Sequence, residues 1–375
     1  MGKFGKKTHV SLNPLDCSLI FLGSPKIGKT TLMKEVAEKT VGEDGYMFLE
    51  MYRESGADHI EGIVSESCET WEKFDEVVTD IEENKETDYP DLRVVFIDTW
   101  DNAILLAEKE ALRLWNKKNP EQRTDNINAA YSGFQRGQAK AAELLDEMKY
   151  RLENVGVKVS IIMHIKAKEI SDPITEKTYQ QVTADVSQQY FNRIKKNADV
   201  IAVGYVDRTI VTEKTGRKDI KGKDITKDVV TEEARKIKFR DSGYAIDAGG
   251  RLKYIVEEVP FEADAFITAI KEALEDEVKS AGVSLTERKK EDKVREKEAI
   301  QSANEESKKA KANKIDEERN EALIGEISKK FAELNKEQKT AFKALMSEVG
   351  VVNFKEPEST PTSALEQLLE FFTAA

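Results

Sequence analysis

A glycine-rich loop with a lysine and two threonines lies near the N-terminus, after an apolar run and before a helix-like segment. The sequence "GSPKIGKTT" matches the pattern G-x-x-x-x-G-K-[ST]. In this pattern backbone N–H groups curl around phosphates, the lysine reaches the β- and γ-phosphates, and the hydroxyl binds Mg²⁺. A chance match has odds of about one in a hundred. The predicted nucleotide-binding residues are Gly23, Ser24, Pro25, Lys26, Ile27, Gly28, Lys29, Thr30 and Thr31, with Thr30 also a metal ligand.

Acidic residues follow two of the apolar runs downstream of the loop. Asp98 ends "RVVFID" and is predicted to organise the metal and its water shell, whereas Asp101 is a weaker candidate, expected in the first turn of a helix. Hydrolysis also needs a group that positions the attacking water. Glu50, which ends "YMFLE", is the first choice because strand ends of an open parallel sheet meet at one edge, where ligands bind. Glu54 is the reserve.

A histidine ends a third apolar run. His164 closes "VSIIMH" and is therefore expected at the same edge as Asp98 and Glu50. A lone histidine is more often a packing or hydrogen-bonding residue than a functional one. Its shared edge favours a role as a sensor that donates a hydrogen bond to the γ-phosphate.

Short apolar runs alternate with helix-length segments from Leu19 to about Pro260. The runs are "SLIFLG", "YMFLEM", "RVVFID", "VSIIMHI" and "DVIAVGYV". Such strands, buried on both faces, predict a mostly parallel sheet in a three-layer α/β core. Two further strand-like stretches, "ARKIKFRDSGYAI" and "RLKYIVEEV", are expected at one edge of the sheet, joined by a hairpin turn at "DAGG".

The overall composition restricts the function classes. The chain has 375 residues, 39% of them hydrophobic, and a formal net charge of -12, so its overall field repels nucleic acid and any such site must be a local basic patch. Cys17 and Cys68 lie far apart without metal-ligand spacing, so neither a disulfide framework nor a zinc site is indicated. No apolar run approaches the ~18 residues of a membrane span, and we expect a cytoplasmic protein without a membrane partner.

The composition changes sharply after an amphipathic segment that begins near residue 263. Residues 286–320 are almost entirely charged or polar, which predicts a solvated helical or disordered linker. Helical periodicity returns after that, with Leu323, Ile327, Phe331 and Leu334 on one face. We expect an ATPase core over 1–262, a linker over 263–320 and a module of two or three helices over 321–375.

A GTPase and a small-molecule kinase are the alternatives to an ATPase among P-loop proteins. "NKID", residues 313–316, matches a guanine-specifying pattern, but no apolar strand precedes it, and Asp101 occupies the glycine position of the D-x-x-G partner, so adenine is favoured. A small-molecule kinase needs an Arg-rich lid, which "NKKNPEQRTDNINAAYSGFQRGQ" with Arg123 and Arg136 could imitate. The kinase stays open as a minor alternative.

The ordered motifs resemble those of RecA-like P-loop ATPases, and most closely the phage nucleotide-binding proteins among them, some of which are single-strand annealing or recombination proteins. The motifs are "GSPKIGKTT", "VVFIDTWD", "SIIMHIK", "ADVIAVGYVD" and "IKFRDSGYAIDAGGRLKYI", which together span about residues 19–259. The resemblance implies a three-layer RecA-like core that uses ATP and Mg²⁺, assembles into a ring or filament and acts on single-stranded DNA. It also implies that His164 is the γ-phosphate sensor at its strand end.

The segment from Lys166 to Lys196 resembles the region where RecA-like proteins carry mobile DNA-contacting loops. Basic groups can follow phosphates while aromatic rings stack on bases, which binds single strands without reading their sequence. The candidates are Lys166, Lys168, Lys177, Arg193, Lys195 and Lys196, with Tyr179, Tyr190 and Phe191. A solvated loop and helix is the simpler alternative. The basic stretch "EKTGRKDIKGKDITKD" could line a DNA channel or form a surface hairpin.

A short basic element near the end of the core is similar to one that reaches a neighbouring subunit's γ-phosphate in related ATPases. It is "KFR", Lys238 to Arg240, and Arg240 is the expected residue in trans, with Arg251 in reserve. An ordinary charged edge strand is the simpler interpretation. The rival function is an ATP-dependent switch or loader whose C-terminal module docks to another DNA-metabolism protein, such as a single-strand-binding or recombination partner.

Overall fold

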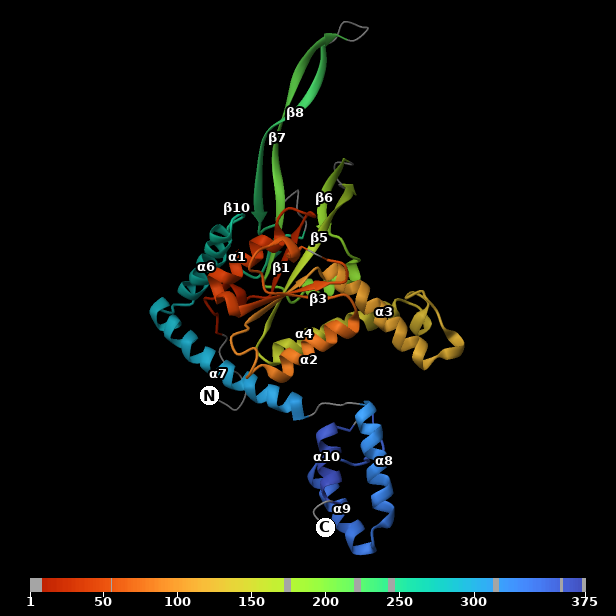
Figure 1. Ribbon diagram of the computed structural model, residues 1–375. Coiled ribbons are helices and arrows are strands. Elements are labelled where there is room, and N and C mark those ends of the chain that lie inside the picture. The colour runs from red at the N-terminus through yellow and green to blue at the C-terminus, as the bar shows by residue number, and fades with distance from the viewer. Residues whose placement is uncertain are drawn as a thin grey trace.

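A single ten-stranded sheet organises the N-terminal two thirds of the chain (Figure 1). The computed structural model describes residues 9–54, 56–171, 177–218, 224–241, 247–312, 317–357 and 360–372. The strands are β1 (Leu19–Gly23), β2 (Tyr46–Met51), β3 (Ser65–Cys68), β4 (Val94–Asp98), β5 (Lys158–Ser171), β6 (Thr178–Ala184), β7 (Val200–Lys218), β8 (Asp224–Lys238), β9 (Gly249–Gly250) and β10 (Glu258–Pro260).

The strand order is β10-β8-β7-β1-β5-β4-β2-β3, with β6 paired to β5 and β9 paired to β7. The neighbours from β3 to β7 pair in parallel. Every residue of β1 and β4 is buried, as expected for strands covered on both faces. The predicted α/β fold with a mostly parallel sheet, typical of a P-loop NTPase core, is confirmed.

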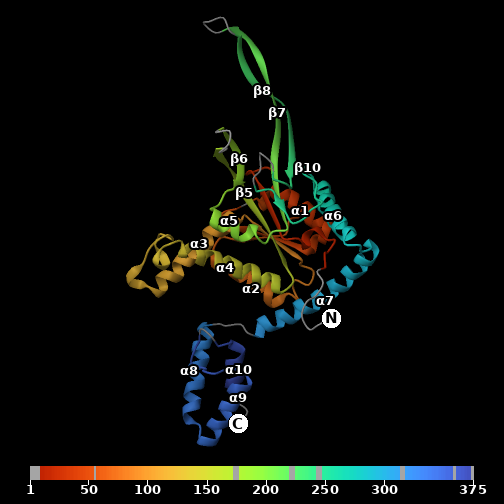
Figure 2. The same cartoon turned by 180° about the vertical axis from the view of Figure 1, so that it is seen from behind.

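Helices cover both faces of the sheet (Figures 1 and 2). α1 (Lys29–Val41) and α6 (Ala263–Ser280) pack on one face, where Phe21 of β1 lies edge-on to Phe266 of α6 at a centroid distance of 6.0 Å. α2 (Trp71–Asn84), α3 (Trp100–Lys118), α4 (Arg136–Asn154) and α5 (Gln188–Lys195) pack on the other. Single 3₁₀ turns span Pro14–Asp16, Glu43–Gly45, Ala57–His59, Pro120–Gln122 and Ala130–Ser132. The apolar cluster around α6 continues beyond residue 262, where the sequence suggested a boundary.

Two hairpins rise from the edge of the sheet at which β1 ends (Figure 1). Gly23, the last residue of β1, is level with His164 of β5 on one side and Gly204 of β7 on the other. Both flanking strands continue past this level, β5 to form an antiparallel hairpin with β6, and β7 to form a longer one with β8. The glycine-rich loop that follows β1 therefore begins between the bases of two hairpins.

The structure around "DAGG" differs from the hairpin turn that the sequence predicted at the sheet edge. β8 and β10 do extend the sheet in antiparallel pairing. Gly249 and Gly250, however, pair with β7 as β9, so they do not form a hairpin turn, and residues 251–255 are not a strand. A Cβ on Gly250 would lie 2.2 Å from the backbone oxygen of Asp199, so glycine serves close approach of two backbones here.

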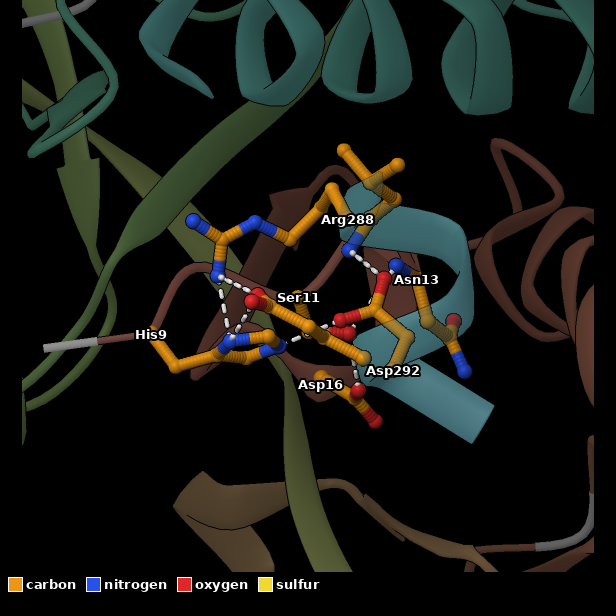
Figure 3. A network of polar contacts seen from close by, with 8 residues as sticks. His9, Ser11, Asn13, Asp16, Arg288 and Asp292 are labelled. Atoms are coloured by element: carbon orange, nitrogen blue, oxygen red, sulfur yellow. Dashed lines mark hydrogen bonds and ion pairs between the residues drawn. The ribbon is translucent and has the colours of Figure 1, made fainter. Parts of the chain in front are cut away.

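The charged segment is helical, as predicted, but one side of it contacts the core. α7 (Leu285–Ala312) donates a hydrogen bond from Ser307 Oγ to Glu83 O at 3.0 Å, and its Glu296 forms a 3.1 Å ion pair with Arg93. Figure 3 shows a polar network at its other end, where the His9 ring contacts both Arg288 and Asp292. The N-terminal segment is thus fastened to α7.

Three helices form a separate apolar cluster at the C-terminus. They are α8 (Glu317–Glu333), α9 (Lys336–Glu348) and α10 (Thr362–Glu370), and Ile327, Phe342 and Leu365 are fully buried among them. Asn335 and Gln338 form a capping box that begins α9. Within the described part of the chain, the helices are all too short or too polar to cross a membrane.

Candidate nucleotide site

The glycine-rich loop turns directly from β1 into the first turn of α1. Gly28 is the residue before the helix and has a φ of 103°, which a residue with a Cβ rarely adopts. A Cβ on Gly23 would lie 3.2 Å from both the Ile27 and Lys29 side chains, so this position also requires a small residue. The loop thus leads to the N-terminus of α1, where free N–H groups and the helix dipole favour anions.

Lys29 is buried against the loop that precedes it. Its Nζ donates to the carbonyl oxygens of Gly23 at 3.4 Å and Ser24 at 3.2 Å, and the residue is only 6% exposed. Burial lowers the pKa of this amine, while the nearby carboxylates of Asp98 and Asp101 oppose that shift. The ammonium is therefore held against the loop, with carboxylates nearby that favour its charged form.

Thr30 and Asp98 meet directly, as the two halves of the predicted metal site. Thr30 Oγ1 donates to Asp98 Oδ2 at 2.6 Å, and Asp98 is 2% exposed. Burial raises the pKa of Asp98 to about 6, although the bond from Thr30 acts in the opposite direction. A hydroxyl and a carboxylate are hard oxygen ligands of the kind that Mg²⁺ prefers, so this pair fits a magnesium ion.

Glu50 and Glu54 both lie near this pair but in different environments. Glu50 is level with Asp98 on the neighbouring strand, is 4% exposed, and accepts a hydrogen bond at Oε1 from Ala57 N at 2.8 Å. Burial raises the pKa of Glu50, and the bond from Ala57 partly offsets this. Glu54 is half-buried. A Cβ built on Gly56 would lie 3.4 Å from Thr30 Oγ1 and 3.7 Å from Glu54 Oε1, so both side chains border Gly56.

His164 is fixed by Asp101. His164 Nδ1 lies 2.9 Å from Asp101 Oδ2, and the His164 backbone N–H donates to Oδ1 at 3.2 Å. Although burial raises the pKa of Asp101, the contacts with His164 leave it below its ordinary value. Asp101 lies in the first turn of α3, as the sequence suggested, and its contact with His164 was not anticipated.

The strand order explains why these residues gather. β5 lies between β1 and β4, and β2 follows β4, so the loop, His164, Asp98 and Glu50 come from four adjacent strands near the level at which β1 ends, although β5 itself continues to Ser171. Carboxyl ends of parallel strands form the ligand-binding edge of open α/β sheets. The sequence predicted this gathering from the strand ends alone.

Arg240 and Arg251 lie apart from the gathered residues and bind backbone of their own chain. Arg240 donates to Ile255 O at 2.8 Å and Lys253 O at 2.6 Å. Arg251 binds Asp199 at 3.2 Å and the Lys196 carbonyl at 2.9 Å. Neither residue joins the site formed by its own loop.

Sequence reasoning missed two residues that contact the outside of the loop. Arg235 Nη1 donates to Ile27 O at 3.2 Å. A Cβ on Gly28 would lie 3.6 Å from the Phe261 ring. The strand alternation that turns Arg235, Ile237 and Phe239 to one face was the only available signal, and it does not indicate what that face contacts.

Two aromatic residues of the expected DNA-contacting segment are buried, and two of its basic residues form ion pairs. Tyr190 and Phe191 are 5% and 1% exposed, because they form the apolar face of α5. The prediction that these two rings stack on bases is therefore wrong. Arg193 pairs with Asp146 at 2.5 Å, and Lys195 pairs with the buried Asp247 at 3.0 Å.

The rest of that segment lies on the β5–β6 hairpin or is exposed nearby. Lys168 and Tyr179 share one face of the hairpin, since Lys168 is opposite Gln181 and residues two apart point the same way. Tyr179 is 41% exposed, and Lys177 and Lys196 are also exposed. Lys166 forms an exposed 3.2 Å pair with Asp185. Residues 172–176 lie outside the described part of the chain.

Three sequence motifs remain: the basic stretch, the lid-like segment and "NKID". The basic stretch 213–228 belongs to the β7–β8 hairpin, although residues 219–223 lie outside the described part of the chain. The lid-like segment with Arg123 and Arg136 joins the C-terminal end of α3 to α4, and Tyr131 within it donates to Ala111 O at 2.9 Å. "NKID" lies wholly outside the described residues.

Comparison with known proteins identifies a family for most of the core. A family model described as an AAA domain matches residues 16–236, more than half of the chain. The match includes the glycine-rich loop, Asp98, His164 and both hairpins up to Lys236. No curated protein matches the sequence.

Proposed function

The chain belongs to the AAA-domain family of P-loop ATPases, and we propose that it uses Mg²⁺-dependent ATP hydrolysis to act on single-stranded DNA, in annealing or strand exchange during phage recombination or replication. The contact between Thr30 Oγ1 and Asp98 Oδ2 at 2.6 Å carries the ATPase part of the proposal. It joins the loop to the acid-bearing strand, as a shared metal ion requires. Bound Mg²⁺ would neutralise charge that develops on the transferred phosphoryl group.

Phosphate binding in this proposal falls to the loop and Lys29. The loop N–H groups bind phosphate oxygens, and the Lys29 ammonium exchanges its bonds to Gly23 and Ser24 for bonds to phosphate. Because Lys29 is buried, its charge acts in a medium of low effective dielectric constant, where attraction to phosphate is stronger than in water.

Glu54 is the carboxylate best suited to orient the attacking water. It is half-buried and accepts a long hydrogen bond at Oε2 from Asn102 Nδ2 at 3.4 Å, whereas the Oε1 of Glu50 is bound more tightly, to the Ala57 N–H at 2.8 Å. That bond ties the segment carrying Glu54 back to β2. We therefore assign water positioning to Glu54, the reserve candidate from the sequence, and assign to Glu50 the positioning of that segment.

His164 suits a hydrogen bond to the γ-phosphate. Asp101 binds its Nδ1, which leaves Nε2 for a ligand. The ring would donate from Nε2 to a γ-phosphate oxygen while Asp101 holds it at Nδ1. Because β5 continues from His164 into the β5–β6 hairpin, a change at the γ-phosphate can reach the hairpin along one strand.

Exposed basic and aromatic side chains on that hairpin support single-stranded DNA as the partner. Lys168 and Tyr179 share a face, so one can contact phosphate while the other stacks on a base. The charge of -12 for the whole chain makes such a local site necessary. Assembly into a ring or filament completes the proposal.

The test of the proposal is ATP turnover with single-stranded DNA, with duplex DNA and without DNA. We expect strong stimulation by single strands and loss of turnover in Lys29→Ala. Lys39→Ala is the matched control, because Lys39 lies on the same helix in an exposed pair with Asp264 at 2.7 Å. An ATP turnover rate that DNA does not change, together with no detectable DNA binding, would instead favour the switch or loader that acts through the C-terminal helices.

The DNA surface has its own test, the affinity for a labelled oligonucleotide at several salt concentrations. Lys168→Ala should weaken binding and reduce the salt slope by about 0.7, the value for one phosphate contact on a single strand. Tyr179→Ala should cost about 1–3 kcal/mol with an unchanged slope. Gln180→Ala, on the opposite face of the same hairpin, is the control. Equal affinity in all three variants would refute this surface.

A further inference from the structure

The base of the longer hairpin contacts the nucleotide loop. Arg235 of β8 donates from Nη1 to Ile27 O at 3.2 Å, a contact between residues 208 positions apart. Ile27 immediately precedes Gly28, the residue before α1. The hairpin and the loop are therefore joined by a charged donor on a backbone carbonyl.

The geometry of one peptide bond gives this contact a consequence inside the loop. The carbonyl of Ile27 and the N–H of Gly28 belong to the same planar trans peptide, so they point in opposite directions. A donor that holds the carbonyl outward turns the N–H inward, toward the side where this loop pattern binds phosphate. A charged donor also forms a stronger hydrogen bond than a neutral one.

An aromatic ring keeps Arg235 and the loop in place. Phe261 N donates to Arg235 O at 3.1 Å, and its ring lies edge-on to the fully buried Phe21 of β1 at 6.1 Å. A Cβ on Gly204 would lie only 2.8 Å from that ring, and one on Gly28 would lie 3.6 Å from it. The ring thus packs between the hairpin base and the loop.

The hairpin is long enough to carry an effect away from the site. Arg235 is opposite Val206, and pairing continues to Lys218 and Asp224. The twelve residue-to-residue steps from Val206 to Lys218 span about 40 Å. Figures 1 and 2 show the hairpin projecting well beyond the sheet.

We propose that Arg235 is a positioning residue that aims the Gly28 N–H at bound phosphate and so couples ATP binding to the β7–β8 hairpin. Coupling of this kind is reciprocal, so a ligand held by the hairpin changes the affinity for ATP by the same factor that ATP changes the affinity for that ligand. The inference rests on the proposed function only in that the loop must bind ATP.

The first experiment measures the affinity for a fluorescent ATP analogue together with kcat and KM. Arg235→Met keeps the length of the side chain and removes its donors, and we expect affinity to fall about five- to tenfold with a smaller change in kcat. Arg235→Lys keeps one charged donor and should recover part of the loss. Arg208→Met is the control, because Arg208 lies on the same hairpin in an exposed 2.9 Å pair with Glu233.

The second experiment measures coupling through tryptic cleavage within residues 214–227, which contain several lysines. ATP should change the cleavage rate in the unaltered protein and in Arg208→Met, but not in Arg235→Met at a saturating ATP concentration. Unchanged affinity and unchanged coupling in Arg235→Met would overturn the inference and leave the ATPase proposal standing. Failure of the unaltered protein to bind the analogue would overturn both.

Discussion

His164 is held at two points by Asp101, through its ring nitrogen Nδ1 at 2.9 Å and its backbone N–H at 3.2 Å. The first bond fixes the ring orientation, and the second fixes the end of the strand that carries it. Asp101 opens α3, and His164 ends the parallel part of β5, so the pair joins two elements beside Asp98. Asp101 is therefore the residue that positions His164.

Replacing Asp101 tests this indirect action. We expect His164→Ala to lower kcat about 100-fold, and Asp101→Asn about tenfold, because a hydrogen bond to a neutral amide oxygen is roughly half as strong as one to a carboxylate. Affinity for ATP should change little. The double variant should be no worse than His164→Ala, since residues acting as one unit are not additive. Multiplicative losses in single-turnover rates would show that Asp101 acts by another route.

Asp98 predicts a stability that depends on pH. Its pKa is raised from 3.8 to about 6 by burial, so the folded state binds the proton more tightly than the unfolded state does. The contribution of the Asp98 proton to the free energy of unfolding is thus fully present below pH 4. It is lost as the pH rises through 6, which lowers the free energy of unfolding by about 3 kcal/mol. Asp98→Asn should unfold several degrees higher than the unaltered protein at pH 8 and at nearly the same temperature at pH 4. Equal melting shifts at both pH values would contradict this.

The same carboxyl predicts how magnesium and protons compete. Metal binding requires the carboxylate, so ATP turnover at low Mg²⁺ should fall as pH drops through about 6. Raising the Mg²⁺ concentration should move this acidic limb to lower pH. Turnover measured from pH 5 to 8 at several Mg²⁺ concentrations checks the shift, and a limb that stays fixed would assign it to another group.

Conservative replacements of Glu50 and Glu54 should have different effects on kcat. Glu54→Gln removes the negative charge that orients water, and we expect kcat to fall about 100-fold with ATP binding retained. Glu50→Gln keeps an oxygen that accepts from the Ala57 N–H, so its effect should stay below about fivefold. Single-turnover hydrolysis distinguishes the two, and the reverse order of effects would restore Glu50 as the residue that positions water.

The gathering of the site at one sheet edge could be predicted because strand ends leave a local signal. Gly23, Glu50, Asp98 and His164 each follow an apolar run, and parallel strands bring such ends together. Arg235 left no such signal, since its contact with Ile27 depends on antiparallel pairing of distant segments. Spacing along the chain does not encode a contact of that kind.

Other sequence predictions were wrong because they used the composition of a segment and not the periodicity of its apolar residues. Tyr190 and Ile194 are four residues apart, which places them on one helix face, and that spacing indicates burial rather than stacking on DNA. The charged α7 similarly carries Ala303 and Ser307 four apart, both buried. These two small residues, the buried Arg288 and the ion pair of Glu296 with Arg93 bring one side of α7 against the core, although its average composition indicates solvent.

Arg240 offers the last prediction, on assembly. Its guanidinium binds Ile255 O and Lys253 O, which holds it at the end of β8 farther from its own loop than Arg235. If Arg240 completes a neighbour's site, Arg240→Ala and Lys29→Ala should each be inactive alone and partly active when mixed, because mixed assemblies contain intact sites. Arg251→Ala, which removes the reserve candidate, is the control and should stay active. ATP turnover across mixing ratios is the measurement, and no recovery at any ratio would assign Arg240 to the stability of residues 253–255 alone.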